Sequence, residues 1–236
     1  MKKIWITGAS SGIGAESASK LAHLGHQVWL TGRNEAALKT HTQQLGSGAR
    51  YSVLDVRDYA SVKSFVETFI AEWTSMDVLV NNAGLGFFEP LVQGNIEQWH
   101  EMIDTNVKGV LNCLHAALPH LIASTGQIIN LGSLASHHVF PNSGVYCASK
   151  HALFAISESI RTELPDKVRV TTISPGSVNT PFIDKTTNEE MLRQYKDYFA
   201  AGLSVGVIAD QIVHAVSMPL GTNISEIVIR PSRAIR

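Results

Sequence analysis

The chain has 236 residues, of which 44% are hydrophobic and 17% are charged, and its formal net charge is -1. A near-neutral chain offers no electrostatic footprint for nucleic acid or for an anionic membrane surface, and no apolar run reaches the roughly 18–20 residues that cross a bilayer. We therefore expect a soluble protein that forms a single domain over residues 1–236.

The cysteines and the first strand pattern favour a cytoplasmic location. Cys113 and Cys147 fall in helical patterns and suggest no disulfide framework. A strand pattern begins at Lys3, which leaves no room for a signal peptide after Met1.

The first part of the chain predicts a strand, a glycine turn, a helix and a second strand. The strand pattern at 3–7 is followed directly by the glycine run 8–14, by helical spacing over 15–24, and by a strand at 26–31. Glycines let the backbone approach a pyrophosphate, and the N–H groups at a helix N-terminus stabilise its charge. The spacing Gly-x-x-x-Gly-x-Gly therefore predicts a dinucleotide site, with a plain turn as the alternative.

The end of the second strand indicates which dinucleotide is bound. An NAD site usually has an acidic residue there, about 20 residues past the glycines, to hold the ribose 2′-OH. Here no acid comes before Glu35, and Arg33 stands in its place. Since a guanidinium pairs well with a phosphate, the predicted cofactor is NADP(H), and a solvated surface arginine is the alternative.

The rest of the chain alternates between helices and strands. Helices are expected over 35–45, 61–73, 96–122, 145–164 and 207–216, and strands over 49–54, 77–80, 127–131, 167–173 and 226–229. This alternation predicts an α/β fold with a doubly wound, three-layer arrangement around a parallel sheet. The polar segment 180–200, which also carries aromatic residues, is predicted to be a mobile lid over the cleft.

Polar residues follow the predicted strands at the edge where such sheets bind ligands. Asp55 could accept from an adenine amine, or it could cap the helix that follows. The run 81–84 allows close approach to a ribose, or it forms a tight turn. Ser133 ends the fifth strand pattern, and Asn106 places an amide inside the apolar pattern of 96–122, where it needs a structural or catalytic reason.

Tyr146 and Lys150 begin a helical pattern and are four residues apart, so they share one helix face. A free phenol titrates near pH ~10, and a nearby ammonium lowers that pKa. A fall to about 7 needs roughly 4 kcal/mol and a second positive charge, such as an oxidised nicotinamide ring. The pair could equally be an exposed helix pair, so the case depends on the other motifs.

In this order and spacing, the motifs resemble the short-chain dehydrogenase/reductase family over nearly the whole chain. They are Thr7-Gly8-Ala9-Ser10-Ser11-Gly12-Ile13-Gly14, Asn81-Asn82-Ala83-Gly84, Asn106, Ser133, Tyr146-x-x-x-Lys150 and Pro175-Gly176. The resemblance implies a sheet of seven parallel strands and the catalytic set Asn106, Ser133, Tyr146 and Lys150, with Ser133 and Tyr146 contacting the substrate. The predicted cofactor-binding residues are Gly8, Ser10, Ser11, Gly12, Ile13, Gly14, Arg33, Asp55, Val56, Asn82, Ala83, Gly84, Tyr146, Lys150, Pro175, Gly176, Val178 and Thr180.

The resemblance also implies an activity and an assembly. We expect an NADP(H)-dependent oxidoreductase that interconverts a small carbonyl compound and its alcohol, with Tyr146 as general acid and base and with Asn106 positioning a water for Lys150. Family members often form dimers or tetramers through two long helices, here around 97–123 and 144–164. The alternatives are an NADP-binding regulator without turnover and a nucleotide-sugar epimerase or dehydratase, although only about 60 residues follow Pro175 for a substrate domain.

The sequence says little about the substrate. Phe87, Phe88 and Phe140 indicate either an apolar pocket or core packing. His137 and His138 are expected to form a solvated loop pair, because no acid or cysteine cluster joins them and no metal site is predicted.

Overall fold

The computed structural model describes residues 1–232, so the last four residues of the expected domain lie outside the described residues. In that part of the chain, seven strands form one parallel sheet in the order β3-β2-β1-β4-β5-β6-β7. The strands are β1 (Lys3–Ile6), β2 (Gln27–Gly32), β3 (Ala49–Val53), β4 (Val78–Asn81), β5 (Gln127–Leu131), β6 (Arg169–Pro175) and β7 (Glu226–Ile229). This confirms the predicted α/β fold with a seven-stranded parallel sheet.

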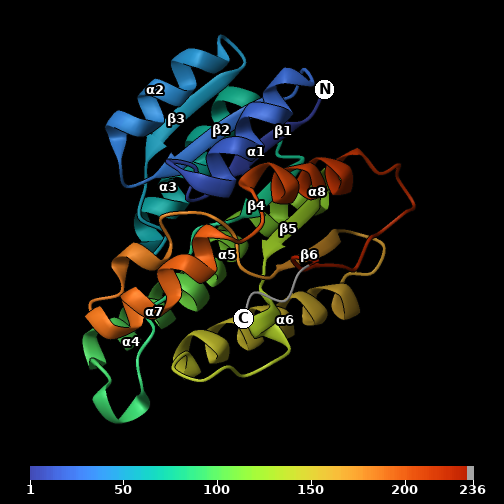
Figure 1. The fold of residues 1–236 in the computed structure, drawn as a ribbon. Coiled ribbons are helices and arrows are strands. Elements are labelled where there is room, and N and C mark those ends of the chain that lie inside the picture. Colours follow the sequence, from blue (N-terminus) through green and yellow to red (C-terminus); the bar gives the residue numbers. More distant parts are fainter. Residues whose placement is uncertain (233–236) are drawn as a thin grey trace.

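Helices cover both faces of the sheet (Figure 1). They are α1 (Gly12–His23), α2 (Glu35–Leu45), α3 (Tyr59–Trp73), α4 (Ile96–Ile103), α5 (Gly109–Ala123), α6 (Gly144–Glu163), α7 (Glu189–Ala200) and α8 (Val205–Ser217). None of these helices is long and apolar enough to span a bilayer.

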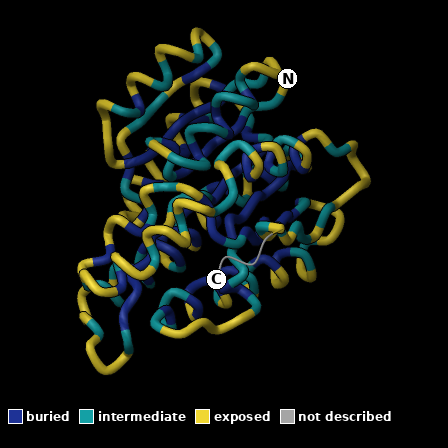
Figure 2. Tube along the Cα trace, in the orientation of Figure 1, coloured by how far each residue is buried: buried dark blue, intermediate teal, exposed yellow. Residues whose placement is uncertain are grey.

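The core consists of two apolar layers, because successive strand residues point to opposite faces of the sheet. On β1, Trp5 packs with side chains of α3, α5 and α6, whereas Ile4 and Ile6 pack with those of α1, α2 and α8. All three strand residues are fully buried. Figure 2 shows the same arrangement, with buried strands at the centre and exposed positions on the outer sides of the helices.

The expected continuous helix over 96–122 is wrong in one respect, because a π-helical turn, Asp104–Lys108, separates α4 from α5. Asn106 lies in this turn and is buried. Its side chain bonds the Leu85 backbone instead of facing solvent, and the wider turn accommodates this contact. Apolar spacing reports which face of a helix is buried, but it does not report one extra residue in a turn.

The strand order places the candidate site. Sheet order reverses between β1 and β4, since β2 and β3 lie on one side of β1 and β5 to β7 lie beyond β4. In doubly wound sheets the ligand crevice opens at this switch point, outside the carboxyl ends of the strands. The loops after β1, β4, β5 and β6 all begin at that edge.

Candidate active site

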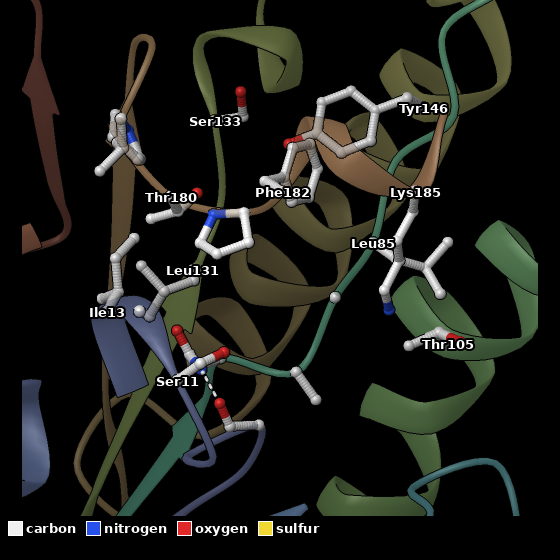
Figure 3. A pocket seen from close by; sticks show the side chains of 18 of the residues that line it. Ser11, Ile13, Leu85, Thr105, Leu131, Ser133, Tyr146, Thr180, Phe182 and Lys185 are labelled. Carbon is white, nitrogen blue, oxygen red and sulfur yellow. Dashed lines mark hydrogen bonds between the residues drawn. The ribbon is translucent and has the colours of Figure 1, made fainter. Parts of the chain in front are cut away.

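A cavity of about 1020 Å³ runs along the carboxyl edge of the sheet. All of the predicted cofactor-binding residues line it except Gly14, and so do Ser133, Tyr146 and Lys150 of the predicted catalytic set. Asn106 does not line the cavity. Figure 3 shows Ser11 and Ile13 at one end and Ser133 and Tyr146 at the other, so one space connects the glycine loop with the hydroxyl groups.

The glycine loop after β1 forms a backbone cradle that side chains would fill. Gly8 has a φ of 63°, and a Cβ there would come within 2.8 Å of the Ala83 Cα. A Cβ at Gly14 would come within 2.5 Å of the Asn82 Nδ2, so Gly14 allows close packing beneath the cavity. The first turn of α1 carries no acidic side chain, and its start faces the cavity through Ser11 to Ile13. Such a helix start fits the pyrophosphate of a dinucleotide.

Asn82 connects this cradle to the end of β4. Its side-chain amide donates to the carbonyl oxygens of Thr7 at 2.9 Å and Gly8 at 3.1 Å. The Thr7 hydroxyl accepts from the backbone N–H groups of Asn82 and Ala83, each at 3.0 Å. These hydrogen bonds fix the run after β4 to the glycine loop. Asn82 therefore stabilises the shape of the cavity besides lining it.

Charged side chains gather at the end of the cavity beside β2 and β3. Arg33 and Arg57 each place an Nη1 atom 3.6 Å from Oε1 of Glu101. Arg57 also binds the Asp55 carboxylate, with a closest contact of 2.6 Å, and this hydrogen bond holds the Asp55 pKa below its usual range. Lys185 lines the same space, and its pKa is lowered first by burial and then by the charge of Arg33.

Asp55 therefore does not cap the next helix, which was one of its two predicted roles. The cap of α3 is Asp58, whose carboxylate accepts from the backbone N–H groups of Ala60 and Ser61. Asp55 instead faces the cavity while its oxygens accept from Arg57.

Lys150 and Tyr146 lie on the first turns of α6 and face the cavity together. The Lys150 Nζ donates to the Leu131 carbonyl oxygen at 2.7 Å and lies 5.8 Å from the centre of the Tyr146 ring. Burial lowers the pKa of Lys150 to about 8. Burial raises the pKa of Tyr146 to about 12, and a hydrogen bond with the Ser133 side chain partly offsets that rise. The phenol is therefore protonated at neutral pH.

Ser133 is held at the end of β5 by a short 3-10 turn, Leu134–Ser136. Its oxygen accepts from the Ala135 backbone N–H at 3.1 Å, and its own backbone N–H donates to Ser136 Oγ at 3.2 Å. This fixes the side chain next to the Tyr146 hydroxyl (Figure 3). A hydroxyl that already accepts one bond keeps its proton for a partner in the cavity.

Asn106 does not reach the cavity, but it bonds to Leu85, which lines it. Its Oδ1 accepts from the Leu85 N–H at 2.9 Å, and its Nδ2 donates to the Leu85 carbonyl at 2.8 Å and to Ser149 Oγ at 3.0 Å. The side chain is therefore fully engaged with the protein, and it holds the loop after β4 against α6. A water-positioning role for Asn106 stays a prediction.

The segment 180–200, which the sequence predicts to lie over the cleft, lines the cavity. Its lining side chains include four aromatic rings and a cation that the sequence did not single out: Phe182, Tyr195, Tyr198, Phe199 and Lys185. That segment contains α7, whose helical character was not expected. Of the three phenylalanines that the sequence left open, Phe88 and Phe140 line the cavity, whereas Phe87 packs in a separate cluster with Met102.

His137 is not part of a solvated pair, as the sequence suggested. Its Nε2 lies 2.5 Å from Oε1 of Glu226 on β7, and its ring packs edge-on against Phe154. The same Glu226 oxygen accepts from Ser174 Oγ at 2.8 Å. His137 thus fastens the turn that carries Ser133 to the edge of the sheet. Within residues 1–232, no three His, Cys, Asp or Glu side chains gather as a metal site.

Comparison with known proteins relates nearly the whole chain to one family of enzymes. A family model described as short chain dehydrogenase matches residues 2–191. An uncharacterized oxidoreductase of Staphylococcus epidermidis is 38% identical over 228 residues, which cover 96% of this chain and 95% of that relative. An NADP-dependent 3-hydroxy acid dehydrogenase of Salmonella typhi is 34% identical over 235 residues, which cover 97% and 94%.

A solved structure leads to the same family. The closed form of a serine dehydrogenase complexed with NADP+ has a TM-score of 0.90 and 32% sequence identity to this chain, and the match covers 97% of this chain and 94% of that one. With the parallel sheet and the residues around its carboxyl edge, these matches show that the chain belongs to the short-chain dehydrogenase/reductase family.

Proposed function

We propose that the protein is an NADP(H)-dependent oxidoreductase that interconverts a small carbonyl compound and its alcohol, with Tyr146 as the general acid and base. One observation carries the proposal: the Ser133 hydroxyl, the Tyr146 phenol and the Lys150 ammonium share one end of a cavity whose other end is the glycine cradle. The NADP named for two of the similar proteins supports the choice of cofactor.

The proposed mechanism assigns each side chain a step. Ser133 donates a hydrogen bond to the substrate carbonyl oxygen and orients it. Tyr146 gives its proton to that oxygen as negative charge develops there, which is general acid catalysis. Lys150 places a positive charge 5.8 Å from the Tyr146 ring and favours the phenolate that remains. NADPH, when bound, supplies the hydride for the carbonyl carbon.

The cofactor would be held by the remaining wall of the cavity. The cradle at Gly8 to Gly14 would hold the pyrophosphate, and Arg33 would pair with the 2′-phosphate. Asp55, Val56, the run 82–84 and the loop from Pro175 to Thr180 would enclose the adenosine and the nicotinamide ribose. Dimer or tetramer formation and a cytoplasmic location stay predictions.

Tyr146→Phe tests the proposal. We expect kcat to fall by several orders of magnitude while the affinity for NADPH changes little, because the substitution removes the proton donor and keeps the ring. NADPH oxidation measured by absorbance over a panel of carbonyl compounds, beside NADPH titration monitored by fluorescence, checks both quantities. Retained turnover in the variant contradicts the role of Tyr146. Tight NADPH binding without turnover of any carbonyl in the wild-type protein points to the regulator instead.

A further inference from the structure

Four aromatic side chains form a wall around the end of the cavity that holds Tyr146. This aromatic wall consists of Phe88 from the loop after β4, Phe182 from the loop after β6, and Tyr195 and Phe199 from α7, and all four line the cavity. Three chain segments far apart in the sequence thus contribute rings to one surface.

The rings are placed directly against the proposed acid. The centres of Phe88 and Phe182 lie 5.8 and 5.5 Å from the centre of the Tyr146 ring. Phe88 in turn lies 5.5 Å from Tyr195 and 5.7 Å from Phe199. Figure 3 shows Phe182 beside the Tyr146 ring on the cavity side. A substrate carbonyl that reaches the Tyr146 hydroxyl must therefore lay its substituent on these rings.

Apart from Lys150, the charged side chains that line the cavity lie away from the aromatic wall. Arg33 and Asp55 belong to the loops after β2 and β3, and Glu35 is the first residue of α2. Lys185 feels the charges of Arg33, Glu101 and Arg57, and its side chain points toward Thr105 and not toward Tyr146 (Figure 3). Lys150 already donates to the Leu131 carbonyl oxygen. Among the lining residues of the described chain, 1–232, no further Arg, Lys or His side chain stands at the aromatic wall.

We infer that the substrate is a neutral carbonyl compound with an aryl or bulky apolar substituent, and not a keto acid. The inference rests on the proposed function and names its substrate class. An aryl group would replace water against four rings, and aromatic rings attract one another at centre distances of about 4.5–7 Å. A carboxylate in the same position would lose its hydration without gaining a cation. The reaction reduces the carbonyl carbon by hydride, places the Tyr146 proton on its oxygen, and leaves an alcohol and NADP+.

Matched substrates separate the effect of charge from the effect of the ring. Ethyl benzoylformate and benzoylformate differ in the negative charge, and ethyl benzoylformate and ethyl pyruvate differ in the ring. With NADPH as reductant, we expect kcat/KM for ethyl benzoylformate to exceed that for benzoylformate at least about 100-fold and that for ethyl pyruvate at least about 10-fold, since burial of an unpaired charge costs more than loss of ring contact.

Variants test whether the aromatic wall causes the preference. Phe88→Leu and Phe199→Leu keep an apolar side chain and remove a ring, so each should lower the ratio of ethyl benzoylformate to ethyl pyruvate turnover several-fold. Tyr59→Leu is the matched control, because Tyr59 is an exposed ring on α3 outside the cavity. It should leave the ratio unchanged.

A binding measurement makes the test independent of turnover. Ethyl benzoylformate should raise the melting temperature of the NADP+-saturated protein, and benzoylformate at the same concentration should not. Faster reduction of benzoylformate than of its ester overturns the inference and leaves the proposed function standing. If neither aryl compound is reduced but another carbonyl compound of the panel is, the inference fails and the proposed function stands. If no carbonyl compound of the panel is reduced, the proposed function fails and the inference fails with it. A wall variant that does not fold is replaced by the other one.

Discussion

Lys150 is a buried ammonium whose position costs stability. Burial lowers its pKa from 10.5 to about 8, which corresponds to about 3 kcal/mol of disfavoured charge. In the unfolded chain the amine keeps its proton up to about pH 10.4. Between about pH 8 and pH 10.4 the unfolded chain therefore binds more protons than the folded one, and the contribution of this group to stability rises with pH.

We expect Lys150→Met to change this pH dependence. The free energy of unfolding of the variant, minus that of the wild type, should be constant below about pH 8 and should fall by about 3 kcal/mol by about pH 10.4, because the variant lacks the titrating group. Urea denaturation of both proteins without cofactor, at several pH values in this range, gives the difference. Lys63→Met, at an exposed lysine on α3, is the control and should give a flat difference. A flat difference for Lys150→Met as well contradicts the shifted pKa.

A second prediction at the scale of single residues concerns Arg33 and the choice between NADPH and NADH. Arg33→Asp removes the guanidinium at the end of β2 and places a carboxylate where a ribose 2′-OH can donate to it. We expect the ratio of kcat/KM with NADPH to kcat/KM with NADH to fall by about 100-fold or more, a change of about 3 kcal/mol. Arg50→Asp is the matched control, since Arg50 pairs with Glu72 and does not line the cavity. An unchanged ratio in Arg33→Asp counts against the 2′-phosphate contact.

At this scale the sequence predicted the residues that motif spacing fixes. The spacing of four from Tyr146 to Lys150 on one helix, and a strand end before Ser133, suffice to bring these side chains to one edge of the sheet. The side chains that contact Arg33, and those that contact the aromatic residues of 180–200, could not be predicted, because long-range contacts between loops leave no periodic signal in the sequence. Glu101 meets Arg33 only after α4 has folded across the end of the sheet.

At the scale of elements, the π-helical turn between α4 and α5 is where local and tertiary demands differ. The side chain of its buried Asn106 hydrogen-bonds both the backbone N–H and the backbone carbonyl of Leu85. Leu85 lies in the loop after β4 and lines the cavity. The sequence predicted that this amide needs a reason, but not which partner it has. The partner is 21 residues away in the chain, and only the folded arrangement of β4 and the π-helical turn brings it near.

We expect Asn106→Leu to destabilise the protein and to displace Leu85. The variant leaves the Leu85 N–H and carbonyl groups buried without partners, and each such group costs about 1–3 kcal/mol. The free energy of unfolding should therefore fall by about 2–4 kcal/mol in urea denaturation. Asn112→Leu is the control on the next turns of α5, where the amide donates to Val56 and Arg57 in a partly exposed position, and its loss should be smaller. Equal losses contradict a special role for the π-helical turn.

At the scale of the whole molecule, the strand alternation predicted the parallel sheet and the edge that carries the site. The order of the strands does not follow from the sequence pattern itself, but the short connections and the right-handed crossovers of parallel strands restrict it strongly. Assembly is less constrained. A hollow of about 560 Å³ between α3, α5 and α6 includes the exposed Leu111. Two of these helices, α5 and α6, fall in the ranges predicted to form a dimer or tetramer, and that assembly stays a prediction.

The segment 180–200 lines the cavity at both ends, with Lys185 near Arg33, Phe182 against Tyr146, and Phe199 against Phe182. With NADP(H) bound as proposed above, this segment would extend along the nucleotide, and a carbonyl compound under its rings would block the exit of the nucleotide. We therefore expect an ordered kinetic mechanism in which NADPH binds before the carbonyl compound and NADP+ dissociates after the alcohol. Product inhibition should accordingly be competitive between NADP+ and NADPH, and noncompetitive between the alcohol and NADPH.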